Sequence, residues 1–335
     1  MKKLYPLFLS GVTKSPIWGG TRLPREWNKC APDGGSVGES WELTVRKREM
    51  SVVQNGPLSG TSVGDLMHEC PEELMGKSSF SNGEFPLLIK FIDAADRLSV
   101  QVHPDDAYAA RVENDRGKTE MWYIVDADED AKIICGLSDG IDNAAFCDAL
   151  HKGDLMSVLK VQKVHAGETY FIPAGLPHAI GKGILIAEIQ QNCDLTYRVY
   201  DYDRRGADGS PRQLHIDKAC DVIRPFDESQ IDAIRYSRGL PTSRKTVLAD
   251  CEYFRVEKLD LRENTHTLSK NGYLRHLLCL NGEGIIACDN ISYPFCRGDS
   301  ILLPASLDDI TLTGTATVIL STASASQYSN RGTLQ

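Results

Sequence analysis

The chain has 335 residues, of which 41% are hydrophobic and 25% charged, the proportions of an ordinary globular protein rather than a disordered or fibrous one. Its net charge of −9 argues against a nucleic-acid partner, because no general cationic field is available to hold a polyphosphate. No apolar run reaches the roughly 20 residues that a membrane helix needs, so we expect no membrane partner. The ten cysteines are scattered without any C-x-x-C pair, which favours reduced thiols in a cytoplasmic protein.

Strand signals dominate the chain, and helical periodicity is confined to two segments. A helix is predicted over Val63–Met75, with Ser62 as its N-cap, and a second over Asn143–Leu159. Short β-branched runs that end in Gly, Pro, Asn or Asp predict strands. In chain order these runs are Leu87–Ile92, Leu98–His103, Met121–Val125, Thr169–Ile172, Ile184–Ile189 and Leu195–Tyr200. Asp201–Arg212 is expected to be an exposed loop and Asp227–Arg244 a linker.

One β unit occurs twice. Residues 167–178 (GETYFIPAGLPH) align without gaps with residues 298–309 (GDSILLPASLDD). In each copy a Gly-acid turn precedes an apolar strand that ends at a Pro-Ala corner, a pattern typical of small antiparallel barrels. The first copy ends at His178 and the second at Asp309. We therefore expect an active first barrel and a structural second barrel.

Strand alternation brings candidate metal ligands together. Within Arg97–His103, side chains alternate between two faces, so Gln101 and His103 share one face. The next strand places Lys118 and Glu120 on a common face by the same rule. Across a sheet, such pairs can converge within the reach of one ion.

His103, Glu120 and His178 then form a set of two imidazoles and one carboxylate, with Gln101 as a fourth ligand. This set suits Zn²⁺ or Fe²⁺ better than Mg²⁺ or Ca²⁺, which prefer oxygen ligands. The other histidines lack carboxylate partners at useful spacing and are interpreted as structural. They are His68, His151, His165, His215, His266 and His276.

A second polar group lies in Cys193–Arg198, where alternation puts Asp194 and Arg198 on one face. The two side chains either project into the active cavity or form an ordinary ion pair. No P-loop or dinucleotide-binding glycine motif occurs, so nucleotide-dependent chemistry is not indicated.

Several motifs together resemble a known family. They are Tyr5–Leu9, Trp18–Gly20, Gly38–Glu42, Leu87–Asp93, Leu98–Pro104, Gly117–Tyr123, Ile172–His178 and Glu188–Arg198. In these segments the chain resembles the type I mannose-6-phosphate isomerases, in their short bacterial form of two cupin barrels. The resemblance implies one Zn²⁺ per chain, with ligands at Gln101, His103, Glu120 and His178. It also implies an active-site arginine at Arg198 and an active-site lysine at Lys118.

The fold class expected is thus all-β dominated, with two cupin (jelly-roll) barrels and a few inserted helices. A catalytic cupin domain with helical insertions is expected at residues 1–235, with its barrel core at about 85–205, and a second, metal-free barrel at 245–335. Longer members of the family carry a large helical insertion between the glutamate and second histidine ligands. Only Phe146–Lys163 occupies that place here, so substrate contacts from the insertion do not carry over.

The reaction implied by the resemblance interconverts mannose 6-phosphate and fructose 6-phosphate through a cis-enediol(ate). With Glu120 as its only anionic ligand, the metal would keep a formal charge of +1 and could polarise the sugar carbonyl. The proton carrier is either Lys118, with a pKa lowered by the cation, or Asp194. Arg198 either neutralises oxyanion charge or grips the phosphate. The phosphate candidates are Lys90, Lys118, Arg198 and Arg204.

Two other functions use the same residues. The ligand set also matches the facial triad of a non-haem Fe²⁺ oxygenase, but Gln101, Lys118 and Arg198 argue against it because an oxygenase needs open metal positions. A sugar-binding cupin without catalysis is the third interpretation. All motif residues persist in the first barrel, which argues against such a loss. The sequence carries no signal for an oligomeric state.

Overall fold

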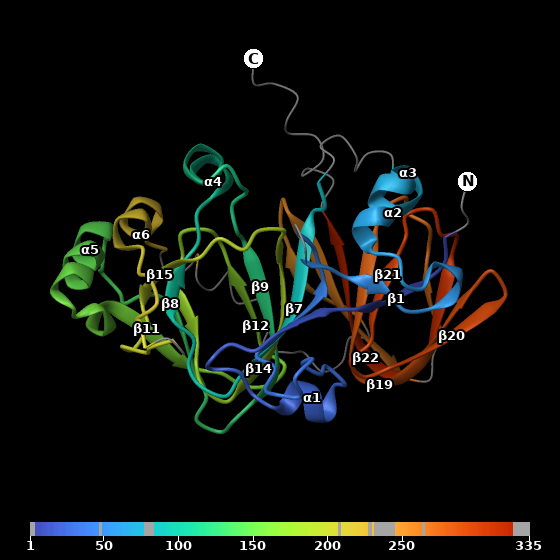
Figure 1. Ribbon diagram of the computed structural model, residues 1–335, viewed down its shortest axis with the longest axis horizontal. Coiled ribbons are helices and arrows are strands. Elements are labelled where there is room, and N and C mark those ends of the chain that lie inside the picture. Colours follow the sequence, from blue (N-terminus) through green and yellow to red (C-terminus); the bar gives the residue numbers. More distant parts are fainter. Residues whose placement is uncertain are drawn as a thin grey trace, which may run out of the picture.

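The computed structural model describes residues 4–46, 49–76, 84–206, 209–226, 230, 245–262 and 265–323. The paired strands in these ranges run antiparallel and build two barrels that lie side by side, as Figure 1 shows. The predicted all-β cupin fold is confirmed. Within the described ranges, no helix is both long and apolar enough to cross a bilayer.

The first barrel consists of two facing sheets. The five-stranded sheet has the order β11 (Leu159–Lys163), β10 (Lys132–Leu137), β13 (His178–Ile180), β8 (Val100–Val102) and β15 (Tyr197–Tyr200). The six-stranded sheet has the order β12 (Thr169–Ile172), β9 (Glu120–Ala127), β14 (Ile184–Gln191), β7 (Leu87–Ala94), β3 (Glu39–Leu43) and β2 (Val12–Lys14). Ile133 and Ile180 of the first sheet share one buried cluster with Trp122 and Ile172 of the second. Burial of this shared apolar face holds the two sheets together.

A nine-stranded sheet forms the second barrel. Its path is β16 (Lys245–Asp250), β17 (Phe254–Arg262), β22 (Ile310–Ala323), β19 (Arg275–Cys288), β21 (Ser300–Leu303), β1 (Leu7–Ser10) and β6 (Val52–Val53). Two further strands pair off this path, namely β18 (His266–Leu268) with β22 and β20 (Ile291–Cys296) with β19. The N-terminal strands β1 and β6 therefore extend the sheet of the C-terminal barrel. The predicted division at residues 235–245 stays a prediction.

The repeat has the same local structure in both copies. Gly167 and Gly298, which open the two copies, have φ angles of +90° and +91°, a region that glycine enters without a steric penalty. Each turn leads into a four-residue strand, β12 in the first copy and β21 in the second. The copies differ at their last position, as the sequence predicted. Where the first copy has His178, the second has Asp309, which accepts a hydrogen bond from the backbone N–H of Lys270 at 2.8 Å.

Helices surround the barrels, and the predicted ones are shorter than expected. The helices are α1 (Arg22–Glu26), α2 (Val63–Glu69), α3 (Pro71–Met75), α4 (Asp106–Val112), α5 (Asn143–Lys152) and α6 (Ile216–Val222), with 3-10 turns η1 (Gly56–Leu58) and η3 (Leu155–Val158). The first predicted helix begins at a Ser62 capping box but is interrupted at Cys70. Cys70 precedes Pro71, and proline disfavours helical backbone at the residue before it. The second ends at Gly153, which is left-handed.

The predicted strands all form, and Thr169–Ile172 has the predicted bounds. A two-residue pairing, β4 (Val45–Arg46) with β5 (Glu49–Met50), was not predicted. The predicted exposed loop after β15 is anchored rather than free, since buried Asp201 accepts hydrogen bonds from Arg204 and Arg212. Apart from Gln230, the predicted linker lies outside the described residues.

The cysteine prediction was wrong for one pair. Cys147 on α5 and Cys220 on α6 form a disulfide, with Cα atoms 5.8 Å apart. A separation of 73 residues leaves no spacing signal in the sequence, and only the packing of the two helices brings the thiols together. The other eight cysteines, all within the described residues, form no disulfide.

Candidate metal centre

Two imidazoles and a carboxylate meet inside the first barrel. His103 follows β8 and His178 begins β13 in the five-stranded sheet, while Glu120 begins β9 in the facing sheet. The Nε2 atoms of His103 and His178 lie 3.5 and 3.4 Å from the two carboxylate oxygens of Glu120. All three side chains are buried, and their ligand atoms lie within 4.8 Å of one another. The predicted trio is therefore one cluster between the two sheets.

The polar atoms of this cluster fit a metal ion. Nδ1 of His178 hydrogen-bonds the carbonyl oxygen of Leu176 at 2.9 Å, which places the proton on Nδ1 and leaves the Nε2 lone pair free. Nε2 of His103 and of His178 has no hydrogen-bond partner although both atoms are buried. Buried polar atoms without partners are costly, and a divalent cation would satisfy both nitrogens together with Glu120.

Burial also keeps the two imidazoles in the form that binds metals. It lowers the pKa of His103 well below its ordinary value, and Lys118 and His178 add to the shift. Burial lowers the pKa of His178 to about 4. Neutral imidazole is the metal-ligating form, so these histidines need not lose a proton near neutral pH before binding an ion.

Gln101 and Arg198 lie beside this cluster on the same sheet. One rung across the five-stranded sheet joins, in strand order, Cys135, His178, Gln101 and Arg198. Directly opposite residues of neighbouring strands project from the same face, so Gln101 and Arg198 share the face of His178. Gln101 is half-buried.

Arg198 is held at its backbone and its side chain. Its Nε donates to Ser99 Oγ at 3.3 Å and its Nη1 to the carbonyl oxygen of Gln213 at 3.0 Å. Its backbone N–H donates to Nδ1 of His215 at 3.3 Å. Burial, and then the positive charge of Arg212, lower the pKa of Arg198. This arginine is thus held in place without a direct carboxylate partner among the described hydrogen bonds and ion pairs.

Lysines and acids alternate beside the metal cluster. Nζ of Lys118 lies 3.1 Å from Glu120 Oε2 and 3.9 Å from Glu188 Oε1. Nζ of Lys90 lies 3.9 Å from the same Glu188 oxygen and 3.8 Å from Asp194 Oδ1. The predicted pairing of Lys118 with Glu120 on one face is confirmed.

The acids determine the charge state of Lys118. Burial alone lowers its pKa, but the carboxylates of Glu120, Glu188 and Asp194 outweigh burial, so the net direction is upward. A neighbouring cation acts in the opposite direction. The predicted lowering of this pKa depends on that cation and stays a prediction.

Two acids that the sequence analysis assigned no role belong to this network. Glu188 lies between Lys90 and Lys118, and burial together with the charge of Glu120 raises its pKa to about 7. Glu39 Oε2 lies 3.6 Å from Nζ of Lys90 and accepts a hydrogen bond from Trp41 Nε1. A sequence signal existed for Glu188, because it is the one acid in the fully buried strand β14.

The remaining predicted residues lie less close to the cluster. The Asp194 side chain is 50% exposed and reaches the network through Lys90. Arg204 is bound to Asp201 and to the carbonyl oxygen of Arg97, and it contacts no metal-cluster residue among the described hydrogen bonds and ion pairs. The structure therefore brings Arg198, Lys118 and Lys90 close to the cluster but holds Arg204 at the loop after β15.

The second barrel has no matching cluster in the part of the chain that the structure describes. His103, Glu120 and His178 are the one group of three potential ligands found there. In the second barrel the buried His276 hydrogen-bonds Ser300 Oγ at 2.8 Å. A pair of cupin barrels, one of which encloses a His/Glu/His cluster that could hold a metal ion, places the chain in the cupin class of proteins.

Comparison with known proteins narrows this class. Residues 7–156 match the model of the phosphomannose isomerase type I catalytic domain, and residues 243–323 match the mannose-6-phosphate isomerase cupin domain. The chain is 38% identical to the mannose-6-phosphate isomerase ManA of Bacillus subtilis over 94% of this chain and 98% of that relative. A crystal structure of the Bacillus subtilis mannose 6-phosphate isomerase superposes with a TM-score of 0.85 and 35% identity, over 94% of this chain and 99% of that one.

A solved zinc-bound mannose 6-phosphate isomerase shares the fold at a TM-score of 0.78 and 16% identity, over 95% of this chain and 99% of that one. The chain belongs to the type I phosphomannose isomerases, as the sequence motifs predicted. It is accordingly an aldose–ketose isomerase.

Proposed function

We propose that this chain interconverts mannose 6-phosphate and fructose 6-phosphate at the His103, Glu120 and His178 cluster. The single observation that carries the proposal is the convergence of these buried side chains beside Lys118. Family membership supports a sugar phosphate as the substrate class, and the names of the relatives given above support mannose 6-phosphate in particular. The oxygenase interpretation is less favoured, because Lys118 and Arg198 offer charges suited to an isomerisation.

A metal ion fits the cluster, and we propose one Zn²⁺ per chain. His103, Glu120 and His178 would hold it, with Gln101 as a fourth ligand on the same face as His178. Two nitrogens and a carboxylate oxygen suit zinc, and a solved relative is zinc-bound. When bound, the ion supplies positive charge that polarises the sugar carbonyl and stabilises the developing enediolate.

The chain's own residues would move the proton between C2 and C1 of the sugar. Lys118 is the first candidate because its amine adjoins the metal cluster. Asp194 is the second candidate, since its carboxylate is half-exposed and could meet substrate directly. Lys118 and Asp194 both belong to the same lysine–acid network, so replacing either one also disturbs the other. The effects of a Lys118 variant and an Asp194 variant therefore have to be compared.

Charge on the substrate would be met by cations of the same cavity. Arg198 is proposed to neutralise charge that develops on the sugar oxygens, or alternatively to bind the phosphate. Lys90 and Lys118 remain phosphate candidates, although four carboxylates already lie beside them, those of Glu39, Glu120, Glu188 and Asp194. Arg204 remains a weaker candidate because Asp201 already pairs with it.

The expected setting is cytoplasmic, with the sugar phosphate as the partner. Eight cysteines that form no disulfide are consistent with a reducing compartment. A coupled assay tests the function: purified protein is given mannose 6-phosphate, and fructose 6-phosphate is measured with and without a chelator. We expect turnover that the chelator abolishes and added Zn²⁺ restores. Oxygen uptake without isomerisation would instead establish the oxygenase.

A further inference from the structure

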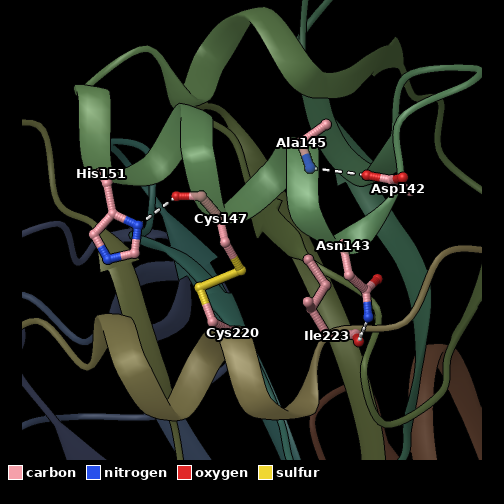
Figure 2. Close-up of a disulfide and its surroundings, with 7 residues drawn as sticks. All are labelled: Asp142, Asn143, Ala145, Cys147, His151, Cys220 and Ile223. Atoms are coloured by element: carbon pink, nitrogen blue, oxygen red, sulfur yellow. Dashed lines mark hydrogen bonds between the residues drawn. A yellow bond between two sulfur atoms is a disulfide. The ribbon is translucent and has the colours of Figure 1, made fainter.

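The disulfide joins α5 to α6 (Figure 2), and these two helices lie at the outer end of the first barrel (Figure 1). The Cys147 and Cys220 side chains are only partly buried, so small thiol reagents can reach them. Beside the disulfide, Nδ2 of Asn143 donates to the carbonyl oxygen of Ile223 at 2.8 Å. These two contacts join α5 to both the middle and the end of α6.

The start of α6 holds Arg198. His215, the residue before α6, donates its backbone N–H to the carbonyl oxygen of Arg198 at 2.8 Å, and its Nδ1 accepts from the Arg198 N–H at 3.3 Å. Gln213, two residues earlier, accepts from the guanidinium at 3.0 Å. The segment that enters α6 therefore contacts the backbone and the side chain of the same arginine.

Helix α6 is short and depends on its neighbours. It has seven residues, and no side chain caps its N-terminus. Isolated helices of this length are unstable in water, so packing against the sheet and the bond to α5 must keep it folded. Ala219 and Val222 of α6 pack in one apolar cluster with Phe146 of α5 and Val100 of β8.

We propose that the Cys147–Cys220 disulfide positions Arg198 through α6, so that isomerase turnover depends on the redox state of this cysteine pair. The proposal rests on the function proposed above. In the oxidised form α5 holds α6 covalently, and residues 213–215 keep Arg198 on the rung with Gln101 and His178. In the reduced form only non-covalent packing remains, and the Arg198 contacts loosen.

The redox step balances as thiol–disulfide exchange with a low-molecular-weight disulfide. The thiolate of one cysteine attacks the small disulfide, which forms a mixed disulfide and releases one small thiol. The second cysteine then displaces the other small thiol and closes the protein disulfide. Two protein thiols are oxidised, one small disulfide is reduced to two thiols, and excess small thiol reverses the reaction.

The experiment compares the oxidised and reduced forms of the full-length, metal-loaded protein. Alkylation and intact mass establish the state of the pair. Amide hydrogen exchange over residues 197–222 reports the Arg198 contacts, and the coupled assay reports kcat and KM. We expect reduction to speed exchange at the Arg198 and His215 amides. We also expect kcat/KM to fall on reduction. The upper limit of this fall is the roughly 10²–10³-fold loss typical of removing one electrostatic contact completely, because reduction only loosens the contacts of Arg198.

Variants separate positioning from general stability. Cys147→Ser should behave like the reduced protein under both conditions, whereas Cys30→Ser, at an exposed cysteine that forms no disulfide, should keep the parental response. In an Arg198→Ala background the redox ratio of kcat/KM should approach 1, although the melting temperature still falls on reduction. A full redox ratio in that background would overturn the proposal.

The two proposals fail in different ways. If isomerisation is absent in both redox states, the proposed function is wrong, and hydrogen exchange still decides whether the disulfide positions Arg198. If isomerisation is present but hydrogen exchange and kcat/KM are the same in both states, the redox proposal is overturned and the proposed function stands.

Discussion

Arg198 combines an unusual set of contacts for a surface-accessible arginine. It shares a rung with Gln101 and His178, and its hydrogen bonds go to a hydroxyl and to a backbone carbonyl rather than to a carboxylate. Its positive charge is therefore not cancelled by a direct partner among the described hydrogen bonds and ion pairs. A charge held in this way can stabilise negative charge on a substrate without prior reorganisation.

Replacing Arg198 tests this role. Arg198→Ala should fold normally, because the side chain is only half-buried, but should lose about 10²–10³ in kcat as one transition-state contact is removed. Steady-state kinetics check the loss of kcat, and metal content and melting temperature check that the variant folds normally. Arg205→Ala is the control, since the exposed Arg205 guanidinium donates to the carbonyl oxygen of Gly209 and contacts no metal-cluster residue among the described hydrogen bonds and ion pairs. Normal turnover in Arg198→Ala would reduce Arg198 to a structural residue.

The proton carrier is tested by comparing Lys118 and Asp194. Lys118→Arg keeps the positive charge but cannot deprotonate near neutral pH, so it should lose activity about as severely as Lys118→Ala if Lys118 carries the proton. Exchange of the substrate C2 proton with solvent, measured for both variants and for Asp194→Asn, identifies the base. Near-parental turnover in Lys118→Arg, with exchange abolished in Asp194→Asn, would transfer the role to Asp194.

At the scale of elements, strand alternation explains why the metal cluster could be predicted. Gln101 and His103 are two residues apart on one predicted strand and so share a face, and the same holds for Lys118 and Glu120. The sequence repeat marks His178 as the position at which the two copies differ. These relations are local. The disulfide, α6 and the Arg198 contacts to residues 213–215 depend on how distant segments pack, and no short-range pattern encodes them.

The two repeat turns offer a matched test of backbone strain. Both Gly167 and Gly298 have φ near +90°, so an alanine at either site should cost about 1–2 kcal/mol of stability. A Cβ at Gly298 would also lie 2.8 Å from the carbonyl oxygen of Trp27, whereas nothing lies within 4 Å at Gly167. Gly298→Ala should therefore be the more destabilising in urea unfolding. Equal losses, or a larger loss for Gly167→Ala, would contradict this reasoning.

At the scale of the whole molecule, the two barrels share a repeated sequence unit, but among the described residues only the first barrel holds the His/Glu/His cluster. The N-terminal strands β1 and β6 join the sheet of the C-terminal barrel, because β1 pairs with β21 on one side and with β6 on the other. The sequence repeat could not reveal this, because β1 and β6 are short and lie far from β21 in the chain. We therefore interpret the second barrel as structural, since the converging ligand atoms found among the described residues lie in the first barrel.

Metal stoichiometry measured alongside isomerase turnover tests the central claim most directly. The parent protein and Asp309→Ala should each hold one Zn²⁺ per chain and isomerise mannose 6-phosphate, because Asp309 accepts a backbone hydrogen bond from Lys270 and is not part of the His103, Glu120 and His178 cluster. His178→Ala should lose both the ion and the turnover, because His178 contributes one of the three converging ligand atoms. Two ions per parent chain, or a His178→Ala variant that keeps its ion and its activity, would contradict the account.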